Sequence, residues 1–235
     1  MNILITGTSK GLGYGLSRHY LEAGHKVYGI SRSSNDELDS FDNFSFLQQD
    51  LTDFTIAGKK VPQFLSGISK LDIIILNAGV LNEIKDLRDT GLDEIKAAMD
   101  INVWANKVLI DTLFDSVDKI DKVVGISSGA SVVGSRGWNV YSLSKAALNM
   151  MMDLYSKEHT DTHFIALAPG LIDTSMQEYI SGLETEDKYP VIKKLKQAKG
   201  TDQMPEPLKA AGIVVSAIDR SDRQPSGSFI DVRQM

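Results

Sequence analysis

A tyrosine and a lysine four residues apart, Tyr141 and Lys145, form the pair in this sequence best suited to acid–base chemistry. Residues at this spacing share one face of a helix, so the phenol and the ammonium would lie side by side. A free tyrosine has a pKa of about 10, and a neighbouring cation lowers that pKa by favouring the phenolate. The pair could therefore exchange a proton with a substrate near neutral pH. On spacing alone, a purely structural pair explains the pattern equally well.

Two serines and an asparagine are further candidates. Ser128 precedes Tyr141 and lies where an apolar, strand-like run ends, and its hydroxyl could polarise a substrate carbonyl. Ser127 competes with it, and chemistry alone does not choose between the neighbours. Asn102 is an amide among apolar helical residues, a placement that calls for a hydrogen-bonding partner. A satisfied core asparagine explains Asn102 about as well as a functional one.

A glycine-rich loop follows the first apolar run and reads Thr6-Gly7-Thr8-Ser9-Lys10-Gly11-Leu12-Gly13. Glycines lack a Cβ, so they let backbone N–H groups approach a pyrophosphate at the positive N-terminus of a helix. The spacing differs from the usual G-x-G-x-x-G, and a strand-to-helix turn packed with glycines is the alternative. The position at the first β–α junction favours a nucleotide site.

The end of the second apolar run distinguishes the two nicotinamide dinucleotides. An NAD site usually has an acidic residue there for the ribose 2′-hydroxyl, whereas this chain has Arg32 between two serines. Arg32 can bind a 2′-phosphate bidentately, and Lys10 can add a second positive charge. We therefore expect NADP(H) in preference to NAD(H). The alternative is that Asp36 or Glu37, slightly later in the chain, binds the ribose.

The elements that must position these residues alternate between strands and helices. Apolar runs of strand length, several of them apolar at every position, alternate with helical segments, which is typical of a parallel sheet covered on both faces. We expect an α/β, doubly wound Rossmann fold with a mostly parallel sheet of roughly seven strands. The strand-length runs are residues 3–5, 27–30, 44–47, 71–76, 122–126, 164–168 and 229–232.

The longest helices are expected at residues 92–116 and 141–158, the second with the adjacent methionines Met150, Met151 and Met152 as packing residues. The pattern weakens between Pro169 and Pro207, and we interpret residues 171–208 as an insertion over one end of the sheet. We expect a single domain over residues 1–235.

Composition excludes several classes of function. The chain has 235 residues, 42% of them hydrophobic, no cysteine and a net charge of −6. Without cysteine there is no disulfide, thiolate catalysis or cysteine-ligated metal, and we expect no metal site. The acidic balance argues against nucleic acid and anionic membrane as partners. No basic leader precedes the first strand and no apolar run of about 18 residues occurs, so we expect a cytoplasmic protein.

Taken in order, these residues resemble the short-chain dehydrogenase/reductase family, in its compact single-domain branch, across essentially the whole chain. The family's four catalytic positions correspond to Asn102, Ser128, Tyr141 and Lys145. The resemblance thus favours Ser128 over Ser127. The cofactor positions that it implies are Gly7, Ser9, Lys10, Gly11, Leu12, Gly13, Arg32, Asp50, Leu51, Asn77, Ala78, Gly79, Tyr141, Lys145, Pro169, Gly170, Ile172 and Thr174.

The resemblance also implies roles for these positions. Hydride would pass between nicotinamide and a carbonyl or alcohol carbon while Tyr141 gives or takes the proton on oxygen. Ser128 would orient that oxygen, and Lys145 would hold the nicotinamide ribose and lower the pKa of Tyr141. Asn102 would position a water that links Lys145 to solvent.

Other matched segments would hold the rest of the cofactor. The resemblance places Asp50 against adenine and Asn77-Ala78-Gly79 at the end of the fourth strand. It places Pro169-Gly170, with Thr174, beside the nicotinamide carboxamide. The family commonly pairs subunits through its long helices, so a homodimer or homotetramer is expected.

The chief departure from the family is the C-terminal segment. Where the family often reads aspartate followed by two glycines, this chain has Asp231-Val232-Arg233-Gln234-Met235. Tetramer packing and closure over the substrate at that end therefore stay open.

The substrate is expected to be a small, partly apolar carbonyl or alcohol compound. Its specificity should come from residues 171–208, 81–86 and 132–139, where Trp138 and Met176 offer apolar contact. Tyr179 and Tyr189 would belong to a lid, or to ordinary surface packing.

Two other functions are weaker interpretations. An NADP(H)-binding regulator or scaffold with little turnover is argued against by the intact Tyr141 and Lys145. A hydrolase using Ser128 is argued against because none of the four histidines stands in a recognisable relation to that serine.

Overall fold

The centre of the molecule is a seven-stranded sheet in which every neighbouring pair of strands is parallel, with the order β3-β2-β1-β4-β5-β6-β7. The computed structural model describes residues 1–185 and 187–235. Each strand-length run of the sequence corresponds to one of these strands, and only Val232 of the last run lies outside its strand, so the doubly wound α/β fold is confirmed. The strands are β1 (Asn2–Thr6), β2 (Lys26–Ser31), β3 (Phe44–Gln48), β4 (Lys70–Leu76), β5 (Lys119–Ile126), β6 (His163–Ala168) and β7 (Ser228–Asp231).

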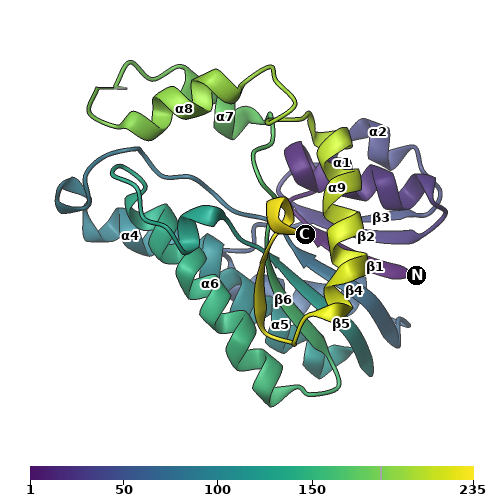
Figure 1. Ribbon diagram of the computed structural model, residues 1–235. Helices are drawn as coiled ribbons and strands as arrows, with labels where there is room; N and C mark the ends of the chain where they lie inside the picture. Colours follow the sequence, from purple (N-terminus) through teal and green to yellow (C-terminus); the bar gives the residue numbers. More distant parts are fainter. Residues whose placement is uncertain (186) are drawn as a thin grey trace.

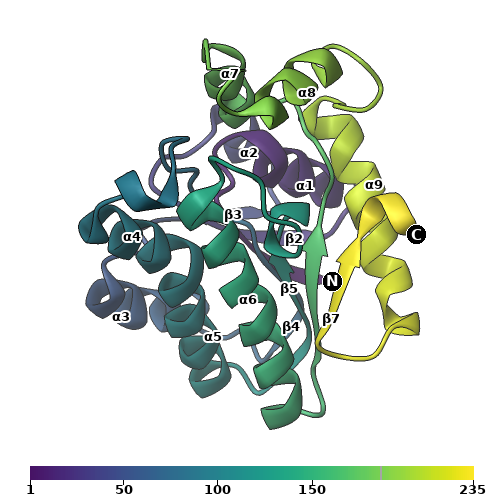
Figure 2. The same ribbon diagram turned by 60° about the vertical axis from the view of Figure 1, so that its left-hand side comes forward.

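Helices cover both faces of the sheet (Figures 1 and 2). The face with α1 and α9 forms one apolar core, and the face with α3, α5 and α6 forms another. The helices are α1 (Gly11–Glu22), α2 (Asp36–Asp39), α3 (Phe54–Phe64), α4 (Leu92–Met99), α5 (Ala105–Ser116), α6 (Asn139–Glu158), α7 (Ser175–Ser181), α8 (Pro190–Ala198) and α9 (Pro207–Arg220).

Strand β1 shows why its residues are apolar at nearly every position. Successive side chains point to opposite faces of a sheet, so Ile3 and Ile5 join the core beneath α1 and α9 while Leu4 joins the other core. All three are fully buried. A strand covered on both sides has no polar face, which explains the continuous apolar runs.

The helix expected at residues 92–116 is divided in the structure. Helix α4 passes into a π-helical turn, Asp100–Trp104, before α5 begins at Ala105. The two helices and the turn follow each other without a loop, so the helical span is as expected but its winding is not. Asn102 lies inside the turn.

Two further boundaries differ from expectation. Helix α6 begins at Asn139, two residues before Tyr141, which places Tyr141 in its first turn. Strand β7 ends at Asp231, and Val232 begins a short 3-10 turn, η5 (Val232–Gln234), instead of extending the strand. The Asp231 side chain caps this turn by accepting a hydrogen bond from the Arg233 backbone N–H, 3.0 Å away.

Helices α7 and α8 lie across one end of the molecule, apart from the two helical layers (Figure 1). They form a third apolar cluster with residues that precede α4. The segment 171–208 is therefore more regular than expected from its sequence, although its residue 186 lies outside the described residues. The buried members of this cluster are Ile84, Ile180, Tyr189, Ile192, Leu195, Ala198 and Met204.

Within the part of the chain that the structure describes, we find no helix whose length and apolar character would let it cross a membrane.

Candidate active site

One cavity of about 1030 Å³ opens where the parallel strands end, and it gathers nearly all the residues singled out in the sequence. Gly13 and Asn102 are the two exceptions, and both are buried beside it. The predicted residues that line the cavity are Gly7, Ser9, Lys10, Gly11, Leu12, Arg32, Asp50, Leu51, Asn77, Ala78, Gly79, Ser128, Tyr141, Lys145, Pro169, Gly170, Ile172 and Thr174.

The glycine loop has the close approach that a dinucleotide requires. Gly7 and Gly11 adopt φ of 75° and 60°, in the left-handed region that favours glycine. A Cβ on Gly13 would lie 2.1 Å from the Gly7 carbonyl oxygen and 2.5 Å from Asn77 Nδ2. The start of α1 is thus pressed against the loop, with its N-terminus at the cavity. This arrangement fits a pyrophosphate.

Thr6, at the end of β1, ties this loop to β4. Its Oγ1 accepts hydrogen bonds from the backbone N–H groups of Asn77 and Ala78, at 3.0 and 2.9 Å. In return, Asn77 Nδ2 donates to the carbonyl oxygens of Thr6 and Gly7. Sequence reasoning missed Thr6, and a hydroxyl residue at the end of an apolar strand was the only signal.

The ends of β2 and β3 present a basic and an acidic side chain at the cavity. Arg32 and Asp50 are both exposed there. Hydrogen bonds from the Thr52 backbone and side chain lower the pKa of Asp50, and the charge of Arg32 lowers it further. Asp50 therefore stays ionised at neutral pH.

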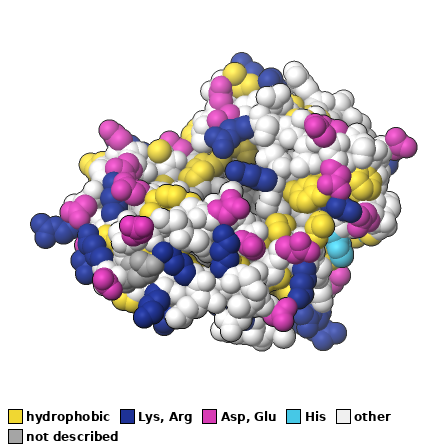
Figure 3. Space-filling view, turned by 90° about the horizontal axis from the view of Figure 1, so that it is seen from above, with side chains coloured by type: hydrophobic (Ala, Val, Ile, Leu, Met, Phe, Trp, Pro, Cys, Tyr) yellow, Lys and Arg dark blue, Asp and Glu magenta, His cyan; other side chains and the backbone are white. Residues whose placement is uncertain are grey.

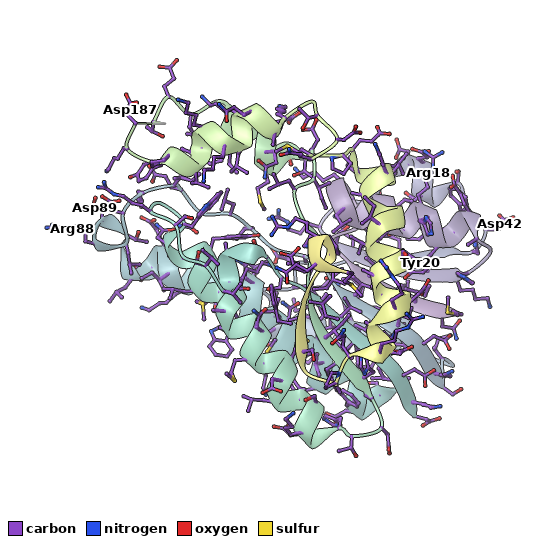
Figure 4. All side chains as sticks on the ribbon, viewed as in Figure 1. Arg18, Tyr20, Asp42, Arg88, Asp89 and Asp187 are labelled. Carbon is purple, nitrogen blue, oxygen red and sulfur yellow. The ribbon has the colours of Figure 1, made fainter. Side chains whose placement is uncertain are left out.

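The acidic alternative for the ribose, Glu37, is occupied elsewhere. Its carboxylate forms an ion pair with Arg18 on α1, 2.5 Å away, and accepts a hydrogen bond from Tyr14. Figure 4 labels Arg18 on the side of the molecule that carries α1 and α2, away from α7 and α8. Asp36 lies on the same short helix, and neither carboxylate lines the cavity. Arg32 is thus better placed for a 2′-phosphate than either acid is for a 2′-hydroxyl.

Tyr141 and Lys145 face the cavity from the first turns of α6, and the Lys145 ammonium lies 5.8 Å from the centre of the Tyr141 ring. Burial raises the pKa of Tyr141, and a hydrogen bond with Ser128 lowers it by less. Burial also lowers the pKa of Lys145 to about 8. Lys145 Nζ donates to the Ile126 carbonyl oxygen at 2.7 Å. Burial and Ser128 account for the direction of the Tyr141 shift, so the predicted lowering of the Tyr141 pKa by Lys145 stays a prediction.

The geometry distinguishes the two serines. Ser127 is buried, and its hydroxyl donates to Asn149 Oδ1 at 2.5 Å. Asn149 Nδ2 then donates to Ser131 Oγ at 2.8 Å, and Ser131 Oγ donates to the Ser128 carbonyl oxygen at 2.6 Å. Ser127 therefore supports the turn, while Ser128 reaches Tyr141. Sequence reasoning did not identify Asn149 or Ser131 in this network.

Asn102 is fully buried in the π-helical turn and has several partners. Its Oδ1 accepts from the Val80 N–H at 2.8 Å, and its Nδ2 donates to the Val80 carbonyl at 3.0 Å and to Ser144 Oγ at 3.0 Å. Both Nδ2 hydrogens are used. The side chain thus fastens the chain after β4 to α6, close to Lys145, and its predicted contact with a water stays a prediction.

Apolar side chains line the part of the cavity beyond Tyr141. Trp138 lies 6.0 Å from Tyr141 between ring centres, and Met176 comes from α7. Of the two tyrosines considered for a lid, Tyr189 is buried in the third apolar cluster and Tyr179 is exposed; neither lines the cavity. Figure 3, seen from above, shows hydrophobic, basic and acidic side chains intermingled on this end of the molecule.

The C-terminal segment adds two residues that sequence reasoning did not assign to the site. Asp231 and Arg233 both line the cavity and form an ion pair of 2.5 Å. The sequence did indicate that this segment differs, because Asp231 is not followed by the two glycines that are common in the family. Among the residues that the structure describes, no group of three or more His, Asp or Glu side chains could hold a metal ion.

Comparison with known proteins identifies the same family that the sequence motifs indicate. The family model for short chain dehydrogenases matches residues 1–184. A benzil reductase ((S)-benzoin forming) of Bacillus subtilis is 30% identical, with 98% of each chain covered. A benzil reductase ((S)-benzoin forming) of Saccharomyces cerevisiae is 33% identical over 76% of this chain and 74% of its own. The crystal structure of a short chain dehydrogenase/reductase from Saccharomyces cerevisiae superposes with a TM-score of 0.86 at 25% identity, covering 98% of this chain and 95% of the other.

Proposed function

The chain belongs to the short-chain dehydrogenase/reductase family of NAD(P)-dependent oxidoreductases, which act on CH–OH and C=O groups, and on that premise we propose that it is an NADP(H)-dependent ketone reductase with Tyr141 as its proton donor. The observation that carries the proposal is the buried Tyr141 hydroxyl beside Ser128 and Lys145, in the same cavity as the glycine loop. A nucleotide site and an acid–base site thus share the same space.

The hydroxyls of Ser128 and Tyr141 are the natural pair to hold a substrate carbonyl oxygen. The nicotinamide, when bound, supplies the hydride to the carbonyl carbon. Because burial raises the pKa of Tyr141, its phenol is protonated at neutral pH and can give its proton to the oxygen. A protonated donor suits reduction better than oxidation. Ser128 orients the oxygen and stabilises the negative charge that develops on it.

Lys145 and Asn102 would position the reacting groups. Lys145 is buried beside Tyr141 and would donate hydrogen bonds to the ribose hydroxyls of the cofactor. Asn102 holds the chain after β4 against α6 through Val80 and Ser144, which keeps the wall around Lys145 in place. The geometry needed for proton transfer thus depends on both residues.

NADP(H) is the proposed cofactor because two exposed cations, Lys10 and Arg32, line the adenosine end of the cavity. A guanidinium can bind a 2′-phosphate through paired hydrogen bonds, and the second cation adds attraction. Glu37, the carboxylate that would oppose a phosphate, is paired with Arg18 instead.

The proposed substrate is an apolar or aromatic ketone. Trp138, Met176 and Leu195 line the cavity beyond Tyr141, and such walls bind apolar molecules. The names of the two benzil reductases point to the same chemistry. We propose that residues 171–208, which contribute α7 and α8, cover this substrate.

We also propose that copies of the chain associate through α5, α6 and the turn before α5. Trp104, Met150 and Leu154 are 47%, 58% and 55% exposed there. Large apolar side chains exposed together on neighbouring helices are typical of subunit contacts.

The decisive experiment measures cofactor binding and turnover in the same proteins. The wild-type chain should bind NADPH more tightly than NADH in a fluorescence titration and should oxidise NADPH when an aromatic ketone is added. Tyr141→Phe should lose about 100-fold to 10,000-fold in kcat, the usual contribution of a general acid, while its NADPH affinity changes little. Tyr20→Phe is the matched control, because the Tyr20 hydroxyl lies outside the cavity lining and has no hydrogen-bond partner among the described residues. Turnover retained by Tyr141→Phe would remove this residue from the mechanism.

A further inference from the structure

The side chain of Arg233 is held by the carboxylate of Asp231. The carboxylate of Asp231 accepts hydrogen bonds from the Arg233 backbone N–H at 3.0 Å, from Nε at 2.9 Å and from Nη2 at 2.5 Å. The Asp231 side chain is only 6% exposed, whereas that of Arg233 is 59% exposed. A buried carboxylate thus fixes the orientation of a guanidinium that solvent and ligands can reach.

The side chain of Arg233 crosses the substrate end of the cavity. A Cβ on Gly170, after β6, would lie 3.8 Å from Arg233 Cγ and 3.9 Å from its Cδ. A Cβ on Gly129, directly after Ser128, would lie 3.0 Å from Arg233 Nη2. The stem therefore passes over Gly170, and the guanidinium reaches the segment that carries Ser128.

Arg233 keeps donors for a ligand. Within the described residues, its side chain donates to Asp231 alone, through Nε and Nη2, and a guanidinium has further N–H groups on Nη1 and Nη2. Its positive charge is already balanced by Asp231. A balanced guanidinium attracts a carboxylate or phosphate weakly, but it still donates a strong hydrogen bond to a neutral carbonyl oxygen.

We propose that Arg233 determines specificity by donating a hydrogen bond to a second carbonyl oxygen, next to the carbonyl held by Ser128 and Tyr141, so that the enzyme prefers neutral vicinal diketones to monoketones. One carbonyl is reduced, and the other only accepts the hydrogen bond. Gly129 matters because a Cβ there would lie 3.0 Å from Arg233 Nη2 and would crowd the guanidinium. The inference rests on the proposed ketone reductase activity.

The test compares two substrates of the same skeleton. Benzil carries two adjacent carbonyls, and deoxybenzoin has a methylene in place of one of them. Their intrinsic reactivities differ, but this difference is the same for every variant, so the informative quantity is the change in the benzil to deoxybenzoin ratio of kcat/KM. A hydrogen bond to a charged donor corresponds to a change of about tenfold to 100-fold. Arg233→Gln should lower the ratio by about that factor.

A second variant guards against misfolding, because Arg233→Gln leaves the buried Asp231 carboxylate without its partner. The double variant Asp231→Asn with Arg233→Gln removes both charges together and should lower the ratio equally. Arg223→Gln, an exposed arginine outside the cavity lining, is the control that should keep the wild-type ratio.

Each outcome is decisive. A wild-type ratio in the double variant, with turnover of both ketones, would overturn the role of Arg233 and leave the ketone reductase proposal intact. Benzoylformate, an anionic 2-oxo acid, is assayed in parallel. If substitution of Arg233 lowers kcat/KM for benzoylformate more than for benzil, the preference for neutral diketones is overturned. NADPH binding by the wild type without reduction of either ketone would overturn the proposed function itself, and this inference with it.

Discussion

Burial acts in opposite directions on the two titratable groups at the centre of the cavity. It raises the pKa of Tyr141 and lowers that of Lys145 to about 8. In both cases the neutral form is favoured, since a low-dielectric site disfavours charge of either sign. The phenol is thereby kept protonated, as the proposed role of proton donor requires, and the Lys145 ammonium loses its proton more readily than an exposed lysine does.

Arg32 should control the choice of cofactor. Arg32→Asp replaces the cation proposed to bind the 2′-phosphate with an anion. The NADPH to NADH ratio of kcat/KM should therefore fall by about 30-fold or more, as expected from the loss of a charge-assisted hydrogen bond. Lys26→Asp makes the same change of charge at the opposite end of β2, on an exposed residue outside the cavity lining, and serves as the control. Equal ratios in Arg32→Asp and wild type would contradict the assignment of NADP(H).

The residues that form or support the site differ in how readily they can be predicted from the sequence. Tyr141 and Lys145 were predictable because a fixed spacing on one helix brings them together. Thr6 and Asn149 were not, because each acts through hydrogen bonds to segments far away in the sequence. The Asp231–Arg233 pair lies in one short segment, but only the neighbouring ends of β5 and β6 give it a place in the cavity.

At the scale of elements, the strands were the most predictable part of the fold and the helices less so. Buried parallel strands are marked by apolar runs, whatever their partners. The π-helical turn at Asp100–Trp104 has no such mark, since it accompanies the contacts of Asn102 with Val80 and Ser144. Helices α7 and α8 have 7 and 9 residues, too few for a clear helical period in a polar segment.

The junction of β1 and α1 should tolerate no side chain at Gly13. A Cβ there would lie 2.1 Å from the Gly7 carbonyl oxygen, so Gly13→Ala should lower the free energy of unfolding by about 1–3 kcal/mol through overpacking and weaken NADPH binding. Gly212→Ala is the matched control, because this glycine lies in α9 with no atom within 4 Å of a Cβ. Gly212→Ala should instead raise the free energy of unfolding by about 0.5–1 kcal/mol. Urea denaturation of both variants measures the difference, and equal effects would contradict the crowding at Gly13.

At the scale of the whole molecule, the third apolar cluster joins α7 and α8 to the loops around the substrate end of the cavity. Asp86, in the segment before α4, accepts hydrogen bonds from Arg136 Nε and Nη2 at 2.8 and 2.7 Å. Lys188, just before α8, lies 3.5 Å from the same carboxylate. Figure 4 shows the neighbouring residues Arg88, Asp89 and Asp187 at the same end of the molecule. Three separate segments thus meet at Asp86.

Removing the charge of Asp86 should loosen this end. In Asp86→Asn, the backbone amides of α7 and α8 should exchange hydrogen for deuterium several-fold faster, because local opening depends on few contacts there, and KM for the ketone should rise. Asp89→Asn is the control: its carboxylate is exposed and lies 3.9 Å from Arg88. Unchanged exchange in Asp86→Asn would show that the apolar cluster alone holds the helices.

The same contact should be insensitive to mild acid. The ion pair with Arg136 lowers the pKa of Asp86 to about 2, below the value of about 3.9 in an unfolded chain. Stabilisation from a depressed carboxyl pKa is present above the unfolded value and is lost as the pH falls through the folded value. KM should therefore show no dependence on Asp86 titration between about pH 5 and pH 9.

The order of strands in the sheet has a consequence for how the pocket is completed during synthesis. The glycine loop, Arg32 and Asp50 follow β1, β2 and β3, the first three strands to leave the ribosome, whereas Arg233 follows β7, the last. Domains generally fold as units, so the complete pocket requires β7 as well as the earlier strands. The residues for the nucleotide are thus made well before Arg233, and the wall proposed to bind the substrate is added only after β7 has been synthesised. A ribosome stalled before β7 would hold a chain with the nucleotide-side residues but without Arg233.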